Sequence, residues 1–138
     1  MISSLLLFSC SRGEGSEEAL QEATKLQDAT MKAELDMEDK LKALSSSITV
    51  LPDSLKSVPL DSLEAIQADY TEWQSTLVTI PGEEHDHHDH SGHDHDHDHA
   101  PADDLTPEMM LEIQKELNKQ ASQLTGRIMN LEQMVKAE

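Results

Sequence analysis

The residues with the clearest chemistry are eight histidines, which are all the histidines of the chain and lie between His85 and His99. They alternate with aspartates in the sequence HDHHDHSGHDHDHDH, inside an acidic tract from Gly82 to Asp104. Imidazole nitrogens suit Zn(II), Cu(II) and Ni(II), and carboxylates complete a coordination sphere or orient the imidazole ring. The tract therefore predicts a segment that binds divalent transition metals, with the candidate ligands His85, His87, His88, His90, His93, His95, His97, His99, Asp86, Asp89, Asp94, Asp96 and Asp98.

The same tract predicts labile binding. The strict alternation from His93 to His99 does not fit one face of a helix, and no apolar residue fixes either side of it to a core. A structural metal site needs one fixed set of ligands, whereas this tract offers many interchangeable ones. We expect the tract to be disordered without metal and to exchange Zn, Cu or Ni quickly, and we expect no tightly bound cofactor.

Other interpretations of the tract stay open. It also fits an acidic spacer kept for solubility, although spacers are usually rich in Gly, Ser, Glu or Pro. A purification tag fits poorly, because the run is internal and interleaved with aspartate. Histidine in an anionic tract is easier to protonate than free histidine, so a sensor or buffer of acid pH is a third interpretation.

Charge and motif content argue against several other functions. The formal net charge is -18, and the stretch from Glu83 to Asp104 contains no Lys or Arg, so nucleic acid and anionic membrane surfaces are unfavourable partners. A cation or a basic protein is the natural electrostatic partner.

No Gly-rich phosphate loop or helical HExxH motif occurs, and we expect no enzymatic activity. Methionines at helical spacing fit core packing better than Cu(I) ligation; they are Met31, Met37, Met109, Met110, Met129 and Met134.

The N-terminus predicts lipidation at Cys10. An apolar run from Leu5 to Phe8 is followed by the small residue Ser9 and by Cys10, the only cysteine, and this resembles the lipobox of a bacterial lipoprotein signal peptide. The leader is short and lacks a basic residue before Leu5, which a start upstream of Met1 would explain. A frayed terminus with a free thiol is the alternative. We expect a cell-envelope protein held by a lipid membrane anchor, facing the periplasm or exposed on the outer membrane.

Apolar periodicity predicts an all-α protein, an antiparallel three-helix bundle with long helices of coiled-coil type and a disordered His/Asp-rich crossover loop. The first helix begins at Ser16, weakens at the serines 45–47 and is over by Pro52; the second begins near Pro59 to Ser62 and its seam reaches Ile80; the third begins after the cap Thr106. Residues 1–15 are the signal remnant and tether, 16–81 hold helices one and two, 82–105 are the loop and 106–138 hold helix three. The predicted seams are Ala19, Ala23, Leu26, Thr30, Ala33, Met37, Leu41, Leu44, Ile48 and Leu51; Leu63, Ile66, Tyr70, Trp73, Leu77 and Ile80; and Met110, Ile113, Leu117, Ala121, Leu124, Ile128, Leu131 and Val135.

The stretch LDSLEAIQADYTEWQSTLVTIPGEEHDHHDH and the later LTPEMMLEIQKEL resemble a group of small His-rich predicted lipoproteins of Bacteroidota, some of which carry the label "viral A-type inclusion protein". The resemblance covers about half of the chain. Its matching positions are Trp73, Leu77, Val78, Pro81, Gly82, the histidines from His85 to His99, and Thr106, Pro107 and Glu108. The resemblance implies lipidation and envelope location, and it implies no activity.

We therefore expect an envelope lipoprotein whose His/Asp-rich loop captures or buffers divalent metal ions and passes them to an envelope metal transporter. The alternative is a helical scaffold or adaptor that binds another helical envelope protein, with the loop as an acidic spacer. That alternative depends on helices one and three being longer than helix two, which would leave apolar seam uncovered at one end.

Overall fold

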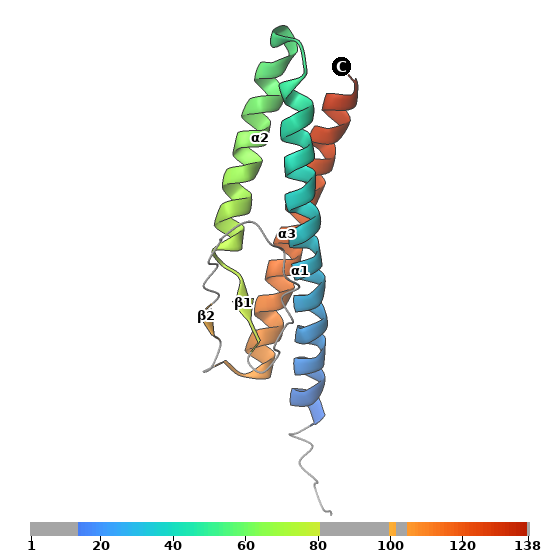
Figure 1. The fold of residues 1–138 in the computed structure, drawn as a ribbon. Helices are drawn as coiled ribbons and strands as arrows, with labels where there is room; N and C mark the ends of the chain where they lie inside the picture. Colours follow the sequence, from blue (N-terminus) through green and yellow to red (C-terminus); the bar gives the residue numbers. More distant parts are fainter. Residues whose placement is uncertain (1–13, 81–99, 102–104, 138) are drawn as a thin grey trace, which may run out of the picture.

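A computed structural model describes residues 14–80, 100–101 and 105–137 of the chain (Figure 1). Its elements are α1 (Glu14–Thr49), α2 (Asp53–Gln74), β1 (Val78–Thr79), β2 (Ala100–Pro101) and α3 (Pro107–Ala137). The three helices pack together, with α1 and α3 in contact over a longer stretch than either has with α2 (Figure 1). The prediction of an all-α protein is confirmed, with the addition of the two short strands.

The first helix is longer and more regular than expected. α1 begins at Glu14, slightly before the predicted start at Ser16, and continues through the serines to Thr49. The hydroxyls of Ser46, Ser47 and Thr49 donate to carbonyls one turn earlier, at 3.1, 3.0 and 2.8 Å. These exposed residues therefore satisfy their hydroxyl groups on the helix itself, and α1 ends before Pro52 as predicted.

The start of the second helix was predicted wrongly. α2 begins at Asp53, and Pro59 lies inside it with its side chain buried. Proline has no N–H, so the carbonyl of Leu55 cannot receive its usual helical hydrogen bond, but only this one bond of the ladder is lost. Burial of the Pro59 ring, together with Asp53 at the positive end of the helix dipole, favours continuing the helix.

The predicted continuation of this helix to Ile80 was also wrong. α2 ends at Gln74, where the Ser75 and Thr76 hydroxyls donate to the carbonyls of Glu72 and Trp73 at 2.6 and 2.7 Å. The N–H groups of Thr76 and Leu77 also bond three residues back, to the carbonyls of Trp73 and Gln74 at 3.0 and 3.2 Å, so the last turn tightens, its carbonyls are satisfied and the chain becomes extended. Thr106 does cap α3 as predicted, accepting from the Met109 N–H at 3.3 Å.

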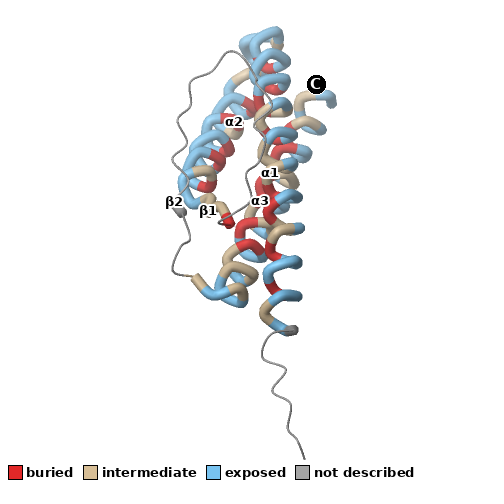
Figure 2. Tube along the Cα trace, turned by 60° about the horizontal axis from the view of Figure 1, so that its bottom comes forward, coloured by how far each residue is buried: buried red, intermediate tan, exposed pale blue. Residues whose placement is uncertain are grey.

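Most of the predicted seam residues form one core between the helices, whereas Leu26, Leu51 and Met110 are only half-buried (Figure 2). The buried residues of the core are Met37, Leu41, Leu44, Ile48, Leu63, Ile66, Tyr70, Trp73, Leu117, Ala121, Leu124, Ile128 and Leu131. The methionines were expected to pack in the core, and Met37 does. Met109, Met129 and Met134 lie off the seam and are about half exposed. The two aromatic residues of the core lock α2 to both neighbours. Trp73 donates its indole N–H to the carbonyl of Leu117 on α3 at 3.2 Å.

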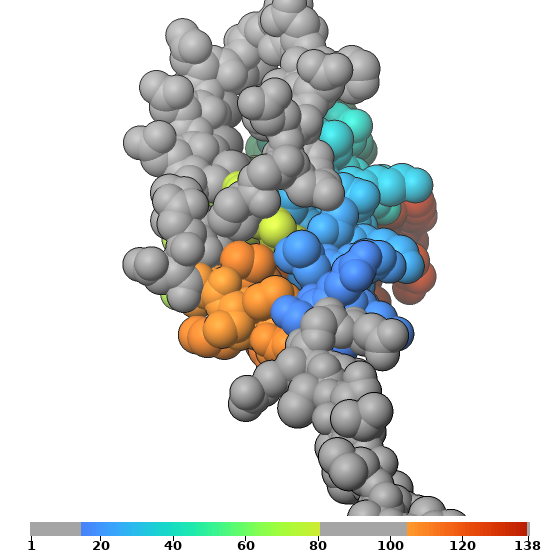
Figure 3. All heavy atoms as spheres, turned by 90° about the horizontal axis from the view of Figure 1, so that it is seen from below, coloured from blue at the N-terminus to red at the C-terminus, as the bar shows by residue number. Residues whose placement is uncertain are grey.

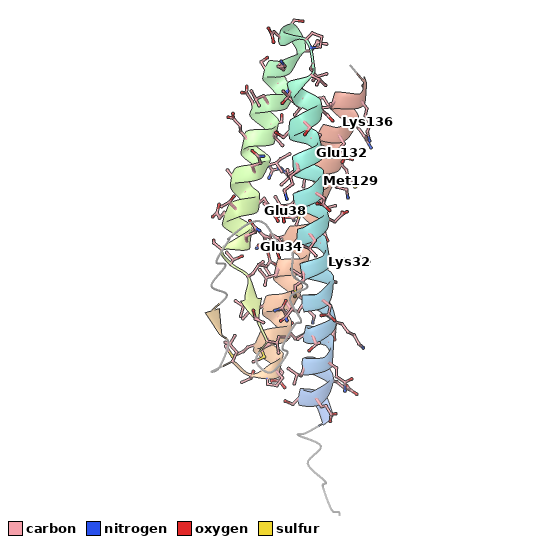
Figure 4. All side chains as sticks on the ribbon, viewed as in Figure 1. Lys32, Glu34, Glu38, Met129, Glu132 and Lys136 are labelled. Atoms are coloured by element: carbon pink, nitrogen blue, oxygen red, sulfur yellow. The ribbon has the colours of Figure 1, made fainter. Side chains whose placement is uncertain are left out.

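Tyr70 joins α2 to α1 through a polar cluster at the edge of the core. Its hydroxyl donates to the Glu34 carbonyl at 3.3 Å, and the Gln74 amide donates to the Glu34 carboxylate at 2.8 Å and to the Tyr70 oxygen at 3.1 Å. Glu38 follows Glu34 one turn later on α1 (Figure 4). Burial, reinforced by the negative charges of Glu34 and Glu38, raises the pKa of the Tyr70 hydroxyl well above its ordinary value.

None of the helices, over the residues that the structure describes, is long and apolar enough to cross a membrane.

The single tyrosine of the chain makes this pKa directly measurable. Absorbance of tyrosinate should show a midpoint well above pH 10 in the folded protein and a midpoint of about 10 in urea. Because the unfolded chain loses this proton first, the free energy of unfolding should fall as pH rises above about 10. The Tyr70→Phe variant, which lacks this hydroxyl, should show a shallower fall. Equal midpoints in the folded and urea-unfolded protein would contradict the burial of the hydroxyl.

Candidate functional site

The predicted site residues lie outside the residues that the structure describes. These are His85, His87, His88, His90, His93, His95, His97, His99, Asp86, Asp89, Asp94, Asp96 and Asp98, together with the predicted lipidation site Cys10. Over residues 14–80, 100–101 and 105–137, no three His, Cys, Asp or Glu side chains form a group that could hold a metal ion. The structure does describe the segments that lead into and out of the His/Asp tract.

The two ends of the tract are paired with each other. β1 and β2 form a parallel ladder in which Val78 is opposite Ala100 and Thr79 is opposite Pro101. Pro101 has no N–H to donate, and in a two-stranded ladder both strands are edge strands, where proline is tolerated. The pairing places Val78 and Thr79, which are separated from His85 by five residues, beside Ala100 and Pro101, which directly follow His99. We call β1 and β2 the stem of the tract.

β1 occupies the place that a longer α2 would have filled. Seen from below, it lies between the N-terminal parts of α1 and α3 (Figure 3). The following residue, Ile80, is buried with 3% of its surface exposed, and Leu77 packs at the edge of the core. Residues 77–80 thus pack against α1 and α3 beyond the end of α2, and Ala23, one turn before Gln27 on α1, is also buried.

Two buried glutamines hold the backbone of this segment. Gln27 on α1 accepts a hydrogen bond from the Ile80 N–H at 2.7 Å, and Gln114 on α3 donates its amide to the Val78 carbonyl at 2.8 Å. Both side chains are almost fully buried, at 4% and 2% exposed. An extended segment between two helices cannot pair with their backbones, whose groups are already bonded within each helix. Side chains must therefore satisfy it, because an unpaired buried amide or carbonyl is costly.

A third polar contact ties the two long helices together beside the stem. Asn118 on α3 donates its amide to the Thr30 hydroxyl on α1 at 3.4 Å. Gln27, Thr30 and Gln114 are the buried polar residues of the part of the chain that the structure describes, and they sit on adjacent turns of α1 and α3. Every buried side-chain nitrogen and oxygen among these described residues has a hydrogen-bond partner. The stem is thus attached to a polar layer in an otherwise aliphatic core.

Sequence reasoning missed Gln27, Gln114 and the strand they hold. Two signals were available. Each glutamine directly follows a predicted seam residue, Leu26 or Ile113, so it lies next to the core stripe. In addition, Val78, Thr79 and Ile80 before Pro81 are three consecutive β-branched residues, which favour extended structure over helix.

Comparisons of the chain with protein-family models, with curated proteins and with solved structures found no match.

Removing one of these glutamines tests the stem. Gln27→Leu should lower the free energy of unfolding by about 1–3 kcal/mol, because the buried Ile80 N–H is left unpaired. Gln21→Leu, on an exposed turn of the same helix, should change it by less than about 0.5 kcal/mol. Chemical denaturation followed by helical circular dichroism measures both. A Gln27→Leu protein as stable as the Gln21→Leu protein would show that the bond contributes little.

Proposed function

We propose that this protein is an envelope lipoprotein that captures and buffers divalent transition-metal ions on its His/Asp tract. The observation that carries the proposal is that every histidine lies between His85 and His99, in a stretch whose flanking segments, Val78–Thr79 and Ala100–Pro101, are paired in the stem. The acidic residues attract the cation, and the imidazoles provide the nitrogen ligands.

The stem supports this function by lowering the entropic cost of chelation. A free peptide must close a loop each time two distant histidines bind one ion, and that closure costs conformational entropy. In this protein the ends of the tract are already paired, so part of this cost is met in folding. Holding the ends together also raises the effective concentration of each ligand for an ion bound by another.

We further propose that the helices run up, down and up as an antiparallel bundle anchored through lipidated Cys10. Only Ser11, Arg12 and Gly13 separate this cysteine from the first residue of α1. The stem lies beside the N-terminal half of α1, away from the α1–α2 turn (Figure 1). In an anchored protein the tract would begin and end at the membrane-proximal end of the bundle, within reach of a metal transporter. The resemblance to predicted lipoproteins supports the same location.

Titration of the whole chain with Zn(II) at neutral pH tests metal capture. We expect binding in the micromolar range or tighter, with several exchangeable ions per chain, and a loss of about tenfold or more in affinity when all eight histidines are replaced by serine. Lowering the pH from about 7.5 to 5.5 should weaken binding strongly, because protonated imidazole cannot bind metal.

Two controls make the result specific. Replacing Asp86, Asp89, Asp94, Asp96 and Asp98 by asparagine keeps the imidazoles and should weaken binding less than the histidine replacement does. A free peptide of residues 82–104 should bind more weakly than the whole chain, because its ends are not held. If the histidine-free chain binds Zn(II), Cu(II) and Ni(II) as well as the original chain does, the proposed function is wrong.

Metabolic labelling with a radioactive fatty acid in the native host tests the anchor. We expect the chain to take up label and to fractionate with membranes, and the Cys10→Ser variant to do neither. Ser11→Ala, a neighbouring change that keeps the cysteine, should behave like the original. Uptake of label by Cys10→Ser would place the modification elsewhere and contradict the predicted lipobox.

A further inference from the structure

A groove runs between α2 and α3 on the side of the bundle away from the polar cluster of Tyr70 and Glu34. It encloses about 300 Å³ and is lined by Ser62, Ala65, Ile66, Arg127, Asn130, Leu131 and Met134. Ile66 and Leu131 are core residues that form its floor. The lining residues Ser62 and Ala65 have small side chains, which allow another backbone to approach α2 closely.

Exposed apolar side chains extend this groove toward the α1–α2 turn. Leu55 and Val58 precede Ser62 at helical spacing on α2 and are 37% and 61% exposed, and Met134 on α3 is 41% exposed. The apolar surface therefore forms a stripe along two adjacent helices, long enough for several turns of a further helix. At the end nearer Trp73, an ion pair between Arg127 and Asp69 joins the two helices across the groove.

The charge beside the groove is mainly negative. On α2, Asp61 and Asp69 lie one turn before and one turn after Ala65, and Glu72 follows at the next turn on the same flank. Arg127 is the only cation among the lining residues, and it is already paired with Asp69. A second copy of this chain would bring the same acidic residues together. Each copy carries a formal net charge of -18, so self-association is disfavoured.

We propose that this groove binds an amphipathic α-helix of a partner protein that carries apolar side chains on one face and Lys or Arg along the edge facing α2. Two helices that flank a groove offer no free backbone edge to a strand, but they accept the ridge of apolar side chains on a third helix. The apolar floor would provide the affinity, and the acidic flank would select a basic partner. This proposal does not rest on the proposed capture of metal ions.

The test uses the full chain and two designed helical peptides with leucines at i, i+3, i+4 and i+7. One peptide carries lysine and the other glutamate at the flanking positions, and fluorescence anisotropy measures their affinities. We expect the lysine peptide to bind about tenfold or more tightly than the glutamate peptide. Ala65→Trp should fill the groove and weaken the lysine peptide about tenfold, whereas Gln67→Trp, on an exposed position of α2 outside the lining, should change its affinity less than about twofold.

Charge variants and a second blocking variant complete the design. Asp61→Lys should weaken the lysine peptide more than Glu64→Lys, although both change the net charge equally. Asn130→Trp blocks the groove from α3 if Ala65→Trp fails to fold by circular dichroism. Because a basic peptide can also bind the acidic tract, affinity that neither tryptophan variant lowers would overturn the proposal. So would equal affinity for both peptides, no binding of either, or self-association of the chain that Ala65→Trp abolishes.

Discussion

The hydrogen bonds from Gln27 and Gln114 to the backbone of residues 78–80 are the constraint on which the stem depends. A buried extended segment between two helices has amide and carbonyl groups that the helices cannot satisfy with their own backbones. One glutamine from each helix meets this requirement, one as acceptor and one as donor. With β1 fixed in this way, the pairing of β1 with β2 fixes where the chain returns before α3.

The difference in helix length explains why such a segment is present at all. α1 and α3 have 36 and 31 residues, whereas α2 has 22. Ser75 and Thr76 end α2 by bonding its last carbonyls, and Trp73 ties that end to α3. Beyond the end of α2, Ile80 is buried and Leu77 packs against the core, so residues 77–80 take the place of the missing turns of α2. Among the exposed apolar side chains of the described residues, Leu55, Val58 and Met134 adjoin the groove between α2 and α3.

Helical periodicity in the sequence was sufficient to predict the three helices and most of their buried positions. Met37, Ile66 and Ile128 were assigned to the core from spacing alone, and all three are buried, because a narrow apolar stripe has one energetically favourable direction to face. Helix ends were less predictable. Proline fits the first turn of a helix, yet Pro59 lies inside α2, where its ring is buried.

The stem could not be predicted because residues 77–80 alone do not decide between helix and strand. Their extended structure depends on contacts with residues that are distant in the sequence. The seam residues Leu77 and Ile80 fit a helical spacing and an extended strand equally well. The choice depends on the Ser75 and Thr76 hydroxyls and on glutamines that are distant in sequence. The metal ligands remain a prediction, because they are identified by the coordination chemistry of histidine and aspartate and not by where the fold places them. The α2–α3 groove was not evident from the sequence, since small residues such as Ser62 and Ala65 carry little signal there.

Hydrogen exchange at the Ile80 amide, measured by NMR, tests the central claim most directly. If Gln27 holds this amide inside the helical core, Ile80 should exchange nearly as slowly as core amides of α1 and α3, even though it follows a strand of only two residues. Exchange as fast as that of an exposed, unbonded amide would show that the segment is not held. The stem, and the pre-closed tract proposed to depend on it, would then lose their physical basis.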